Sequence, residues 1–343
     1  MMQQMTQVEN IQENYALQKL NTFGVAIKSR YLFLLDNLAL IPSLKKLPEP
    51  QLILGGGSNI LFTEDYPGTV ILNRLMGVEI LGDSENFIIV KAMAGEEWHP
   101  FVVQMNQRGY LGLEYLALIP GRVGAAPVQN IGAYGAEVKD FITAVEVYDF
   151  QEERIKVLDR AACKFGYRDS LFKQESGRYL IISVTFKLLK KMEPQLRYRA
   201  LQEYFDSRGE QIEELTMSDI MNAVIAVRSS KLPDPDFIGN AGSFFKNPIV
   251  TKQQAEKVKE EYPELVMYPD QLGYCKLAAG QLIELSGYKG LYENGAGMYE
   301  KQALVLVNLG CNDGKVLWSH ALKVREGVFE KFGVMLEPEP LIL

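Results

Sequence analysis

Two glycine-rich stretches could bind a ligand through their backbone. The first is GGGSN at residues 55–59, and the second is LALIPGRVGAAPVQNIGAYG at residues 116–135. Glycine adopts positive φ angles and lets the main chain come close to a bound group, and successive free N–H groups form a concave site for anions. Together the two stretches favour a site for the pyrophosphate of a dinucleotide.

The second stretch is the more informative of the two. Ordinary tight turns would also explain GGGSN, because glycine clusters occur in loops of many kinds. Apart from its glycines and prolines, the second stretch is mostly Ala, Val, Ile and Leu, whereas a solvated loop would be more polar. This composition favours burial against a large, flat, partly apolar group such as an isoalloxazine ring. Neither stretch matches GxGxxG or GxxxxGK followed by Ser or Thr, which disfavours a Rossmann domain and a P-loop NTPase.

Composition limits the classes of partner. The chain has 343 residues, 47% of them hydrophobic, which is enough for two or three domains with substantial cores. Its formal net charge of −7 provides no global positive field for nucleic acid or an anionic membrane. No apolar run reaches the roughly 18 residues of a membrane span. We therefore expect neither nucleic acid nor a membrane as a partner.

The cysteines and histidines limit the chemistry further. The chain has three cysteines with no CxxC pair and two histidines. Scattered thiols suit a reducing compartment, and the polar N-terminal residues lack a signal-peptide core. Two histidines are too few for a histidine-rich metal site. We expect a cytoplasmic protein without a bound metal.

Hydrophobic periodicity indicates a mixed α+β chain in three parts after a disordered tail at residues 1–14. Residues 15–77 contain a strand and turn around GGGSN, and residues 78–228 combine long strands with a helix near residues 98–108. In residues 229–343, Thr251 and Gln254 form a capping box, and Gly287 and Gly333 end two further helices. His320 falls within the last helical pattern and is expected to pack there. The helix before Pro233 marks a domain boundary.

Five motifs together carry a resemblance to a known family. They are GGGSN, IPGRVGAAPVQNIGAYG, FGYRDSLFK at residues 165–173, GNAGSFFKNP at residues 239–248, and LEPE at residues 336–339. Their order and spacing resemble the UDP-N-acetylenolpyruvoylglucosamine reductases over roughly residues 21–339. The resemblance implies two FAD-binding domains of the vanillyl-alcohol-oxidase type, 15–77 and 78–228. It also implies a substrate-binding α+β domain, 229–343, whose LEPE segment returns to the active site.

The same resemblance implies the reaction and its catalytic residues. NADPH reduces a non-covalently bound FAD, and the enolpyruvyl ether of UDP-N-acetylglucosamine is then reduced to UDP-N-acetylmuramate in peptidoglycan precursor synthesis. Hydride addition to the vinyl carbon drives negative charge into the adjacent carboxylate, and Arg168 of FGYRD is implied to hold it. Ser243 is implied to donate the proton, with Glu339 beside it. From the residues alone, Arg168 pairing with Asp169 and a simple loop serine at 243 would be the alternatives.

Cofactor and substrate residues follow from the same motifs. The implied FAD set is Gly55, Gly56, Gly57, Ser58, Asn59, Gly121, Gly124, Gly132, Ala133, Tyr134, Gly135 and Tyr167. The implied substrate set is Tyr198, Lys231, Asn247 and Gln302, with Tyr198 matching the mobile-loop tyrosine of the type I form. Covalent flavin attachment is not expected, because neither glycine-rich stretch contains His or Cys. Arg122 departs from the small residues common at its position, and it would face either the pyrophosphate or solvent. We expect a monomer.

Two other functions fit parts of the sequence. An FAD-dependent sugar or alcohol oxidase of the same fold would keep the flavin and use dioxygen. A non-catalytic nucleotide-sugar sensor would keep the glycine loops without the chemistry. The joint presence of Arg168, Ser243 and Glu339 argues against the sensor.

Overall fold

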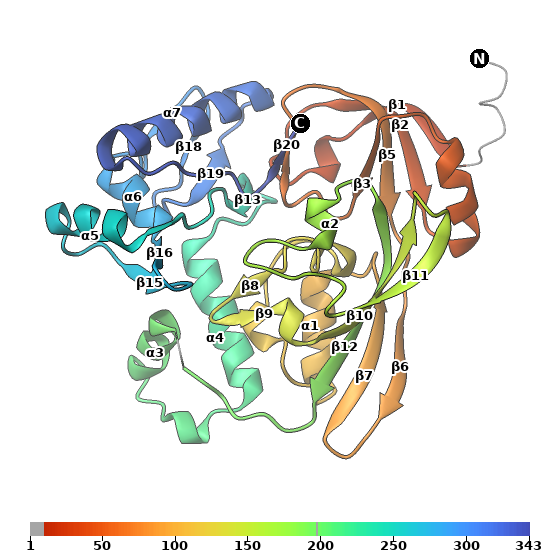
Figure 1. Ribbon diagram of the computed structural model, residues 1–343, viewed down its shortest axis with the longest axis horizontal. Coiled ribbons are helices and arrows are strands. Elements are labelled where there is room, and N and C mark those ends of the chain that lie inside the picture. Colours follow the sequence, from red (N-terminus) through yellow and green to blue (C-terminus); the bar gives the residue numbers. More distant parts are fainter. Residues whose placement is uncertain (1–9, 197) are drawn as a thin grey trace. The chain divides into compact units, whose positions relative to one another are not determined.

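The computed structural model describes residues 10–196 and 198–343. Figure 1 labels its helices and strands. The chain forms two compact units. The first unit contains residues 29–56 and 67–230 together with the described residues up to 15, and the second contains 16–28, 57–66 and 231–343. The three-domain division stays a prediction, because compactness alone does not decide which segments hold cofactor or substrate.

The first unit contains two main sheets. Its five-stranded sheet has, in order, β11 (Arg154–Asp159), β10 (Ile142–Asp149), β12 (Tyr179–Leu189), β7 (Phe87–Met93) and β6 (Val78–Asp83), all antiparallel. The four-stranded sheet has, in order, β1 (Ile11–Ala16), β2 (Lys28–Leu35), β5 (Tyr66–Asn73) and β3 (Gln51–Leu54). A two-stranded ribbon joins β8 (Gly132–Ala133) and β9 (Ala136–Glu137).

The two sheets share part of one core. Phe33 and Ile71 from the four-stranded sheet pack in one cluster with Leu180 and Ile182 of β12. Each of these side chains is at most 1% exposed. The burial of these apolar side chains joins the segments on either side of residue 77 into a single unit.

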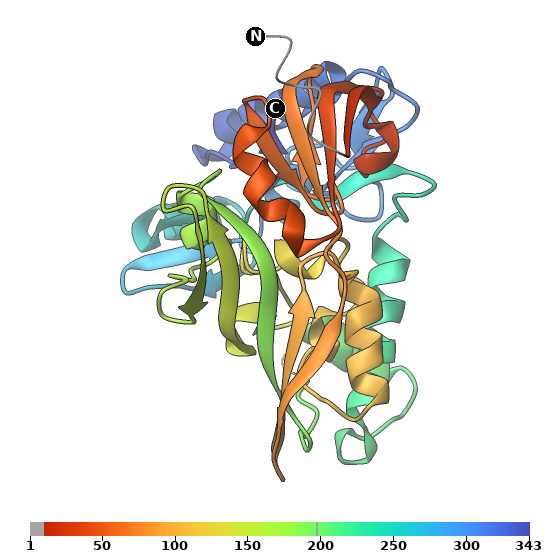
Figure 2. The same cartoon turned by 90° about the vertical axis from the view of Figure 1, so that its right-hand side faces the viewer.

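Helices cover one face of the five-stranded sheet (Figure 2). Buried residues of α1 (Trp98–Gln107) and α4 (Met217–Lys231) belong to the same core cluster as β7 and β12. Both helices confirm the sequence prediction. The unit also contains the short helices α2 (Leu171–Gln174) and α3 (Arg199–Asp206).

Residues 11–14 differ from the expected tail. They belong to strand β1, whose backbone pairs with β2, while residues 1–9 of the tail lie outside the described residues. Most side chains of β1 are exposed, so the strand carries no hydrophobic alternation. Pairing at a sheet edge stabilises it, and its own sequence pattern could not reveal that.

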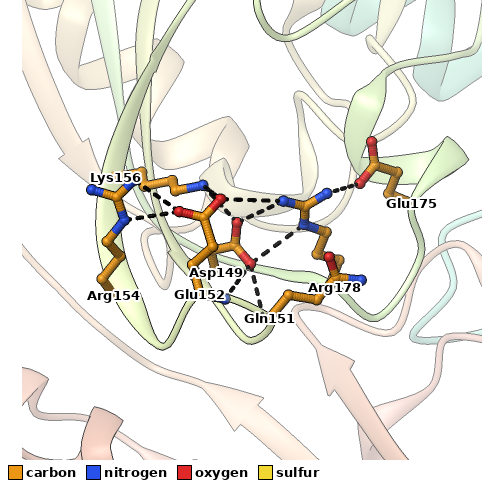
Figure 3. Close-up of polar contacts among 7 residues, drawn as sticks. All are labelled: Asp149, Gln151, Glu152, Arg154, Lys156, Glu175 and Arg178. Carbon is orange, nitrogen blue, oxygen red and sulfur yellow. Dashed lines mark hydrogen bonds and ion pairs between the residues drawn. The ribbon is translucent and has the colours of Figure 1, made fainter.

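An ion-pair cluster closes the end of the β10–β11 hairpin (Figure 3). The fully buried carboxylate of Asp149 accepts hydrogen bonds from Lys156 Nζ at 2.9 Å and Arg178 Nη2 at 3.0 Å. The amides of Gln151 and Glu152 donate to its other oxygen. Burial alone would raise the pKa of Asp149, but these donors outweigh it and hold the pKa well below its usual range.

The second unit combines three small sheets. The largest has, in order, β13 (Gly239–Ser243), β19 (Val305–Asn308), β18 (Ala296–Met298) and β17 (Tyr292–Glu293). The others are β14 (Ile249–Thr251), β16 (Tyr274–Leu277) and β15 (Met267–Pro269), and the parallel pair β20 (Leu341–Ile342) and β4 (Ile60–Leu61). The pairing of β20 with β4 brings the C-terminal residues beside the segment that follows GGGSN.

The helices of the second unit confirm the predicted helix ends, with one change at the start of α5 (Lys252–Glu261). The Thr251 side chain accepts a hydrogen bond from the amide of Gln254, but the Gln254 side chain donates to the carbonyl of Gly333 at 2.9 Å, so the structure shows the Thr251 half of the predicted capping box. Helix α7 (Gly314–Phe332) ends at Gly333, whose φ of +63° is left-handed, and His320 is buried within it. The third helix is α6 (Ala279–Leu285). No described helix is both long and apolar enough to cross a membrane.

Candidate functional site

Arg168 is held by the backbone of the second glycine-rich stretch. Its Nη2 donates to the carbonyl of Gly132 at 2.8 Å, and its guanidinium lies 5.5 Å from the ring centre of Tyr167. A Cβ atom at Gly132 would come within 3.1 Å of Arg168 Nη1 and 2.9 Å of the Ala136 carbonyl. Glycine at 132 therefore makes room for the arginine. The neighbouring Asp169 carboxylate accepts from Gln174 Nε2 at 2.7 Å.

Asn130 joins this stretch to the FGYRD motif, and sequence reasoning missed it. The residue is fully buried with a positive φ of 45°. Its amide nitrogen donates to the carbonyl of Gly166 at 2.9 Å, and its oxygen accepts from the amide of Lys139 at 3.1 Å. Asn tolerates the left-handed conformation better than most residues. The sequence signal that could have indicated this role was an asparagine within a glycine-rich stretch.

Two tyrosines meet near the end of the second glycine-rich stretch. Tyr134 and Tyr198 pack edge to face with ring centres 5.3 Å apart. Tyr134 has a positive φ of 51°, and burial raises the pKa of its hydroxyl. Tyr198 is 44% exposed and immediately precedes α3. The structure thus brings one predicted cofactor residue and one predicted substrate residue into contact.

The start of α1 fixes the first residues of the same stretch. Trp98 Nε1 donates to the carbonyl of Leu116 at 2.8 Å, and the amide of Leu118 donates to His99 Nδ1 at 3.1 Å. Burial and the charge of Arg228 lower the pKa of His99. His99 is therefore a neutral residue that orients this backbone, a role that its isolated position in the sequence did not reveal.

Two glycines contact protein where a ligand was expected. A Cβ at Gly56 would lie 2.9 Å from the Cα of Gly121, and a Cβ at Gly124 would lie 2.5 Å from the Cβ of Ala94. The two glycine-rich stretches therefore touch at Gly56 and Gly121. Within the described part of the chain, the amides of these two glycines donate no hydrogen bond. Adjacent unpaired N–H groups of this kind fit a phosphate of a dinucleotide.

Arg122 faces neither the solvent nor an open loop. Its Nη2 lies 3.4 Å from Glu97 Oε1, and its Nη1 donates to the carbonyl of Gly95. Only 11% of its side chain is exposed. Its Cβ also lies 3.7 Å from the position of a Cβ at Gly55. Arg122 thus supports the contact between the two stretches.

In the second unit, the LEPE segment runs beside the residues that follow Ser243. The amide of Glu339 donates to the carbonyl of Phe244 at 2.8 Å, and Asn59 Nδ2 donates to the carbonyl of Glu339 at 3.4 Å. The carboxylate of Glu337 is 72% exposed and pairs with Lys246. The structure therefore brings Ser243, Glu339 and Asn59 to neighbouring positions, and it directs Glu337 to the surface.

Two predicted substrate residues meet at the start of α6. Asn247 Oδ1 accepts from the amide of Ala279 at 3.0 Å. A Cβ at Gly280 would lie 3.3 Å from Gln302 Oε1. Lys231 is exposed at the end of α4. The second unit thus gathers Asn247 and Gln302, and the remaining predicted residues of that unit, Gly57 and Ser58, lie at the start of its 57–66 segment.

Two family models match the chain. Residues 39–158 match an FAD binding domain, and residues 234–343 match the C-terminal domain of UDP-N-acetylenolpyruvoylglucosamine reductase. The first range includes both glycine-rich stretches. The second includes Ser243, Asn247, Gln302 and Glu339.

Curated relatives match over nearly the full length. A UDP-N-acetylenolpyruvoylglucosamine reductase of Chromobacterium violaceum is 48% identical over 335 residues, covering 95% of this chain and 97% of the relative. The enzyme of that name from Pseudomonas putida is 44% identical over 333 residues, covering 96% and 98%. Among solved structures, UDP-N-acetylenolpyruvylglucosamine reductase from Thermus caldophilus shares the fold. Its TM-score is 0.65 at 24% identity, covering 95% of this chain and 97% of that one.

Proposed function

Since the chain belongs to the family of UDP-N-acetylenolpyruvoylglucosamine reductases, it is a flavin oxidoreductase of peptidoglycan precursor synthesis, and we propose how its residues serve that reaction. The observation that carries this conclusion is the match of both family models, which together contain the glycine-rich stretches and the Ser243 and Glu339 motifs. The confirmed α+β fold of the family supports it.

The glycine-rich stretches hold FAD without a covalent bond. The unpaired amides of Gly56 and Gly121 bind phosphate, with the remaining residues of the predicted FAD set around them. Tyr134 and Tyr167 provide aromatic surface. Tyr167 lies against the guanidinium of Arg168, and Tyr134 follows two residues after Gly132, whose carbonyl binds that guanidinium. When bound, FAD supplies the redox chemistry, taking a hydride from NADPH and passing it to the substrate.

Arg168 binds the carboxylate of the enolpyruvyl group. A guanidinium makes strong bidentate hydrogen bonds to a carboxylate, and preorganised donors at developing charge are usually the largest catalytic contribution. The contact of Nη2 with the Gly132 carbonyl orients the guanidinium before substrate arrives. The residue thus stabilises negative charge that appears on the substrate during hydride addition.

Ser243 donates a proton to the substrate carbon that bears the ether oxygen. A hydroxyl is a weak acid, but a strongly basic enolate carbon can take a proton even from a weak acid. General acid catalysis also depends first on placing the donor within hydrogen-bond reach of the atom that it protonates. Glu339 assists beside it, and its backbone contact with Phe244 supports that position. Tyr198, Lys231, Asn247 and Gln302 bind the uridine diphosphate and sugar, with Lys231 supplying a cation for the pyrophosphate.

We also propose three finer properties. The chain is of the type I form, supported by the contact of Tyr198 with Tyr134. It is a monomer, which light scattering after size exclusion would test. It works in the cytoplasm, which its three free cysteines suit.

Anaerobic half-reactions test the function. We expect NADPH to bleach the flavin absorbance and the enolpyruvyl substrate to restore it, while UDP-N-acetylglucosamine, which lacks the enolpyruvyl group, leaves the flavin reduced. Fast reoxidation by air with no response to NADPH would instead indicate the oxidase. A folded protein that binds no flavin would indicate the sensor.

A further inference from the structure

The first residues of helix α1 bind the backbone at the start of the second glycine-rich stretch. Trp98 Nε1 donates to the carbonyl of Leu116 at 2.8 Å, and the backbone amide of Trp98 donates to the carbonyl of Gly121 at 3.0 Å. Between these two contacts, the amide of Leu118 donates to His99 Nδ1 at 3.1 Å. The helix therefore holds this backbone at three points, and the middle one depends on a side chain that can gain a proton.

The middle contact falls where the backbone is strained. Leu118 has a φ of 57°, in the left-handed region, which brings the Cβ atom close to a carbonyl oxygen and is uncommon for residues other than glycine. Strain of this kind persists only where surrounding contacts hold it. The hydrogen bond from the Leu118 amide to His99 is such a contact. We therefore expect the conformation of Leu118 to depend on this bond.

The bond requires one form of the imidazole. Nδ1 of His99 accepts the hydrogen bond from the Leu118 amide, so this nitrogen carries no proton and the ring N–H is at Nε2. A protonated imidazole has an N–H group at both nitrogens, and its Nδ1–H would meet the N–H of Leu118. Protonation therefore replaces a hydrogen bond by the contact of two donors.

The surroundings of His99 favour the neutral form. Burial, and then the charge of Arg228 on helix α4, lower the pKa of His99 below its usual value of about 6.5. Glu97, the carboxylate immediately before α1, is paired with Arg122 of the stretch at 3.4 Å. While the stretch is in place, His99 thus stays neutral at a pH where a free histidine would take up a proton. A histidine that the stretch has released would titrate closer to its usual value.

We propose that His99 is a positioning residue for FAD, which acts through Leu118 to keep the second glycine-rich stretch in its binding conformation and releases it on protonation. This role rests on the proposed function, because it requires that the stretch hold FAD. His99 itself does not have to touch the cofactor.

Thermodynamic linkage gives the sign of the effect. The FAD-bound protein favours neutral His99, so a proton on the free protein competes with FAD. The affinity for FAD should be constant above about pH 7 and should fall as the pH drops below about 6.5. The pyrophosphate diester and the ring of oxidised FAD do not titrate in this range, so the change reports on the protein.

The experiment measures the Kd of FAD at pH 7.5 and at pH 5.5, from the flavin fluorescence that the holoenzyme releases on dilution. For the wild type, we expect a Kd about tenfold higher at pH 5.5, since the released histidine titrates near its usual value of about 6.5. His99→Asn places a neutral amide oxygen near the position of Nδ1. It should bind FAD within about threefold of the wild type at pH 7.5 and change less than about twofold with pH. His99→Leu, which has no acceptor, should bind FAD roughly tenfold more weakly at both pH values.

The other histidine of the chain provides the matched control. His320 is buried in helix α7 of the second unit, and His320→Leu should keep the wild-type dependence on pH. Because the chain has two histidines, the same variant assigns the imidazole signals in an NMR titration. The signal of His99 should titrate at a lower pH in the holoenzyme than in the protein stripped of FAD.

A wild-type Kd that changes less than twofold between the two pH values would overturn the proposal. A His99→Asn variant with the full wild-type dependence on pH would also overturn it. If His99→Asn does not fold, the NMR titration decides, because an equal pKa of His99 with and without FAD would refute the proposed role. A protein that reduces the enolpyruvyl substrate but binds FAD equally at both pH values would refute this inference alone. A protein that binds no FAD would refute the proposed function as well.

Discussion

Arg168 sits in a backbone conformation that few side chains adopt. Its φ of 51° is left-handed, and the carbonyl of Arg168 accepts a hydrogen bond from Lys173 Nζ at 3.1 Å. Strain of this kind persists where surrounding contacts hold it, and it is frequent at functional sites. Asn130 and Gly132 provide those contacts here, so the side chain that we propose to be catalytic is held by its neighbours in the structure.

Arg168→Met should slow the reaction with substrate and spare the reaction with NADPH. Loss of one donor to developing negative charge typically costs on the order of 10²- to 10³-fold in rate. Stopped-flow absorbance of the flavin measures each half-reaction separately. Arg160→Met, an exposed arginine paired with Asp140, should behave as the wild type. A slowed reduction by NADPH would contradict the assignment.

Ser243→Ala should accept electrons from NADPH at the normal rate and then fail to complete reduction of the substrate. Removal of a general acid typically costs about 10²- to 10⁴-fold. The same stopped-flow measurement applies, and deuterated solvent should slow the wild-type step. Equal impairment of both half-reactions would rule out Ser243 as the proton donor. Ser207→Ala, at an exposed turn, is the control.

At the scale of elements, close packing of main chain holds the glycine-rich stretches together. The contact of Gly56 with Gly121 joins the two stretches, and the contact of Gly124 with Ala94 packs the second stretch against the residue that follows β7. Backbone and Cβ atoms cannot move aside as a long side chain can. These glycines are therefore required for the loops to pack closely, in addition to any role in binding a ligand.

Gly124→Ala should destabilise the protein by about 1 to 3 kcal/mol, because its Cβ would overlap the Cβ of Ala94. The free energy of unfolding is measured for each variant by chemical denaturation. Gly82→Ala is the matched control, because its Cβ would meet Ile89 at an ordinary 3.7 Å. Equal stability of the two variants would show that the loop relaxes freely.

Asp149→Asn should destabilise the β10–β11 hairpin by about 2 to 3 kcal/mol. This is below the usual cost of breaking a buried ion pair, because Arg178 and Lys156 reach solvent and can rehydrate. The folded-state pKa of Asp149 lies below the unfolded value of about 4, so its stabilisation is present above that pH and lost as pH falls below it. Denaturation from pH 7 to pH 3 should therefore show a shallower decline in the variant. An equal loss of stability with falling pH in the variant and the wild type would contradict this prediction.

At the scale of the whole molecule, the chain's last residues are part of the second unit's structure. Strand β20 pairs with β4, and the carbonyl of Leu343 accepts from Thr63 Oγ1 at 2.7 Å. A few residues earlier, Glu339 contacts Phe244 beside Ser243. The C-terminal segment thus links the end of GGGSN to the proposed proton donor.

Deletion of residues 341–343 should lower substrate turnover at least roughly tenfold, a change on the order of 1.4 kcal/mol in the barrier. Without β20, the backbone that holds Glu339 loses its anchor. Flavin content and reduction by NADPH should remain, and both are measured by absorbance. Unchanged turnover would show that the contact with Phe244 alone positions Glu339.

The sequence by itself determined the family, the α+β class and most of the regular elements. Helix ends such as Thr251 with Gln254, and Gly333, depend on residues within one turn, so they are visible in a linear pattern. The motif set identified the family because its members occur together and in order. These signals are local, or they are combinations of local signals.

The tertiary structure alone decided which distant groups meet. Strand β1, the Gly56–Gly121 contact and the Asn130 junction depend on packing between remote segments, for which single residues give no pattern. The physical reason is that burial and compensation of charge are properties of a residue's surroundings in space, which the order of residues along the chain does not specify.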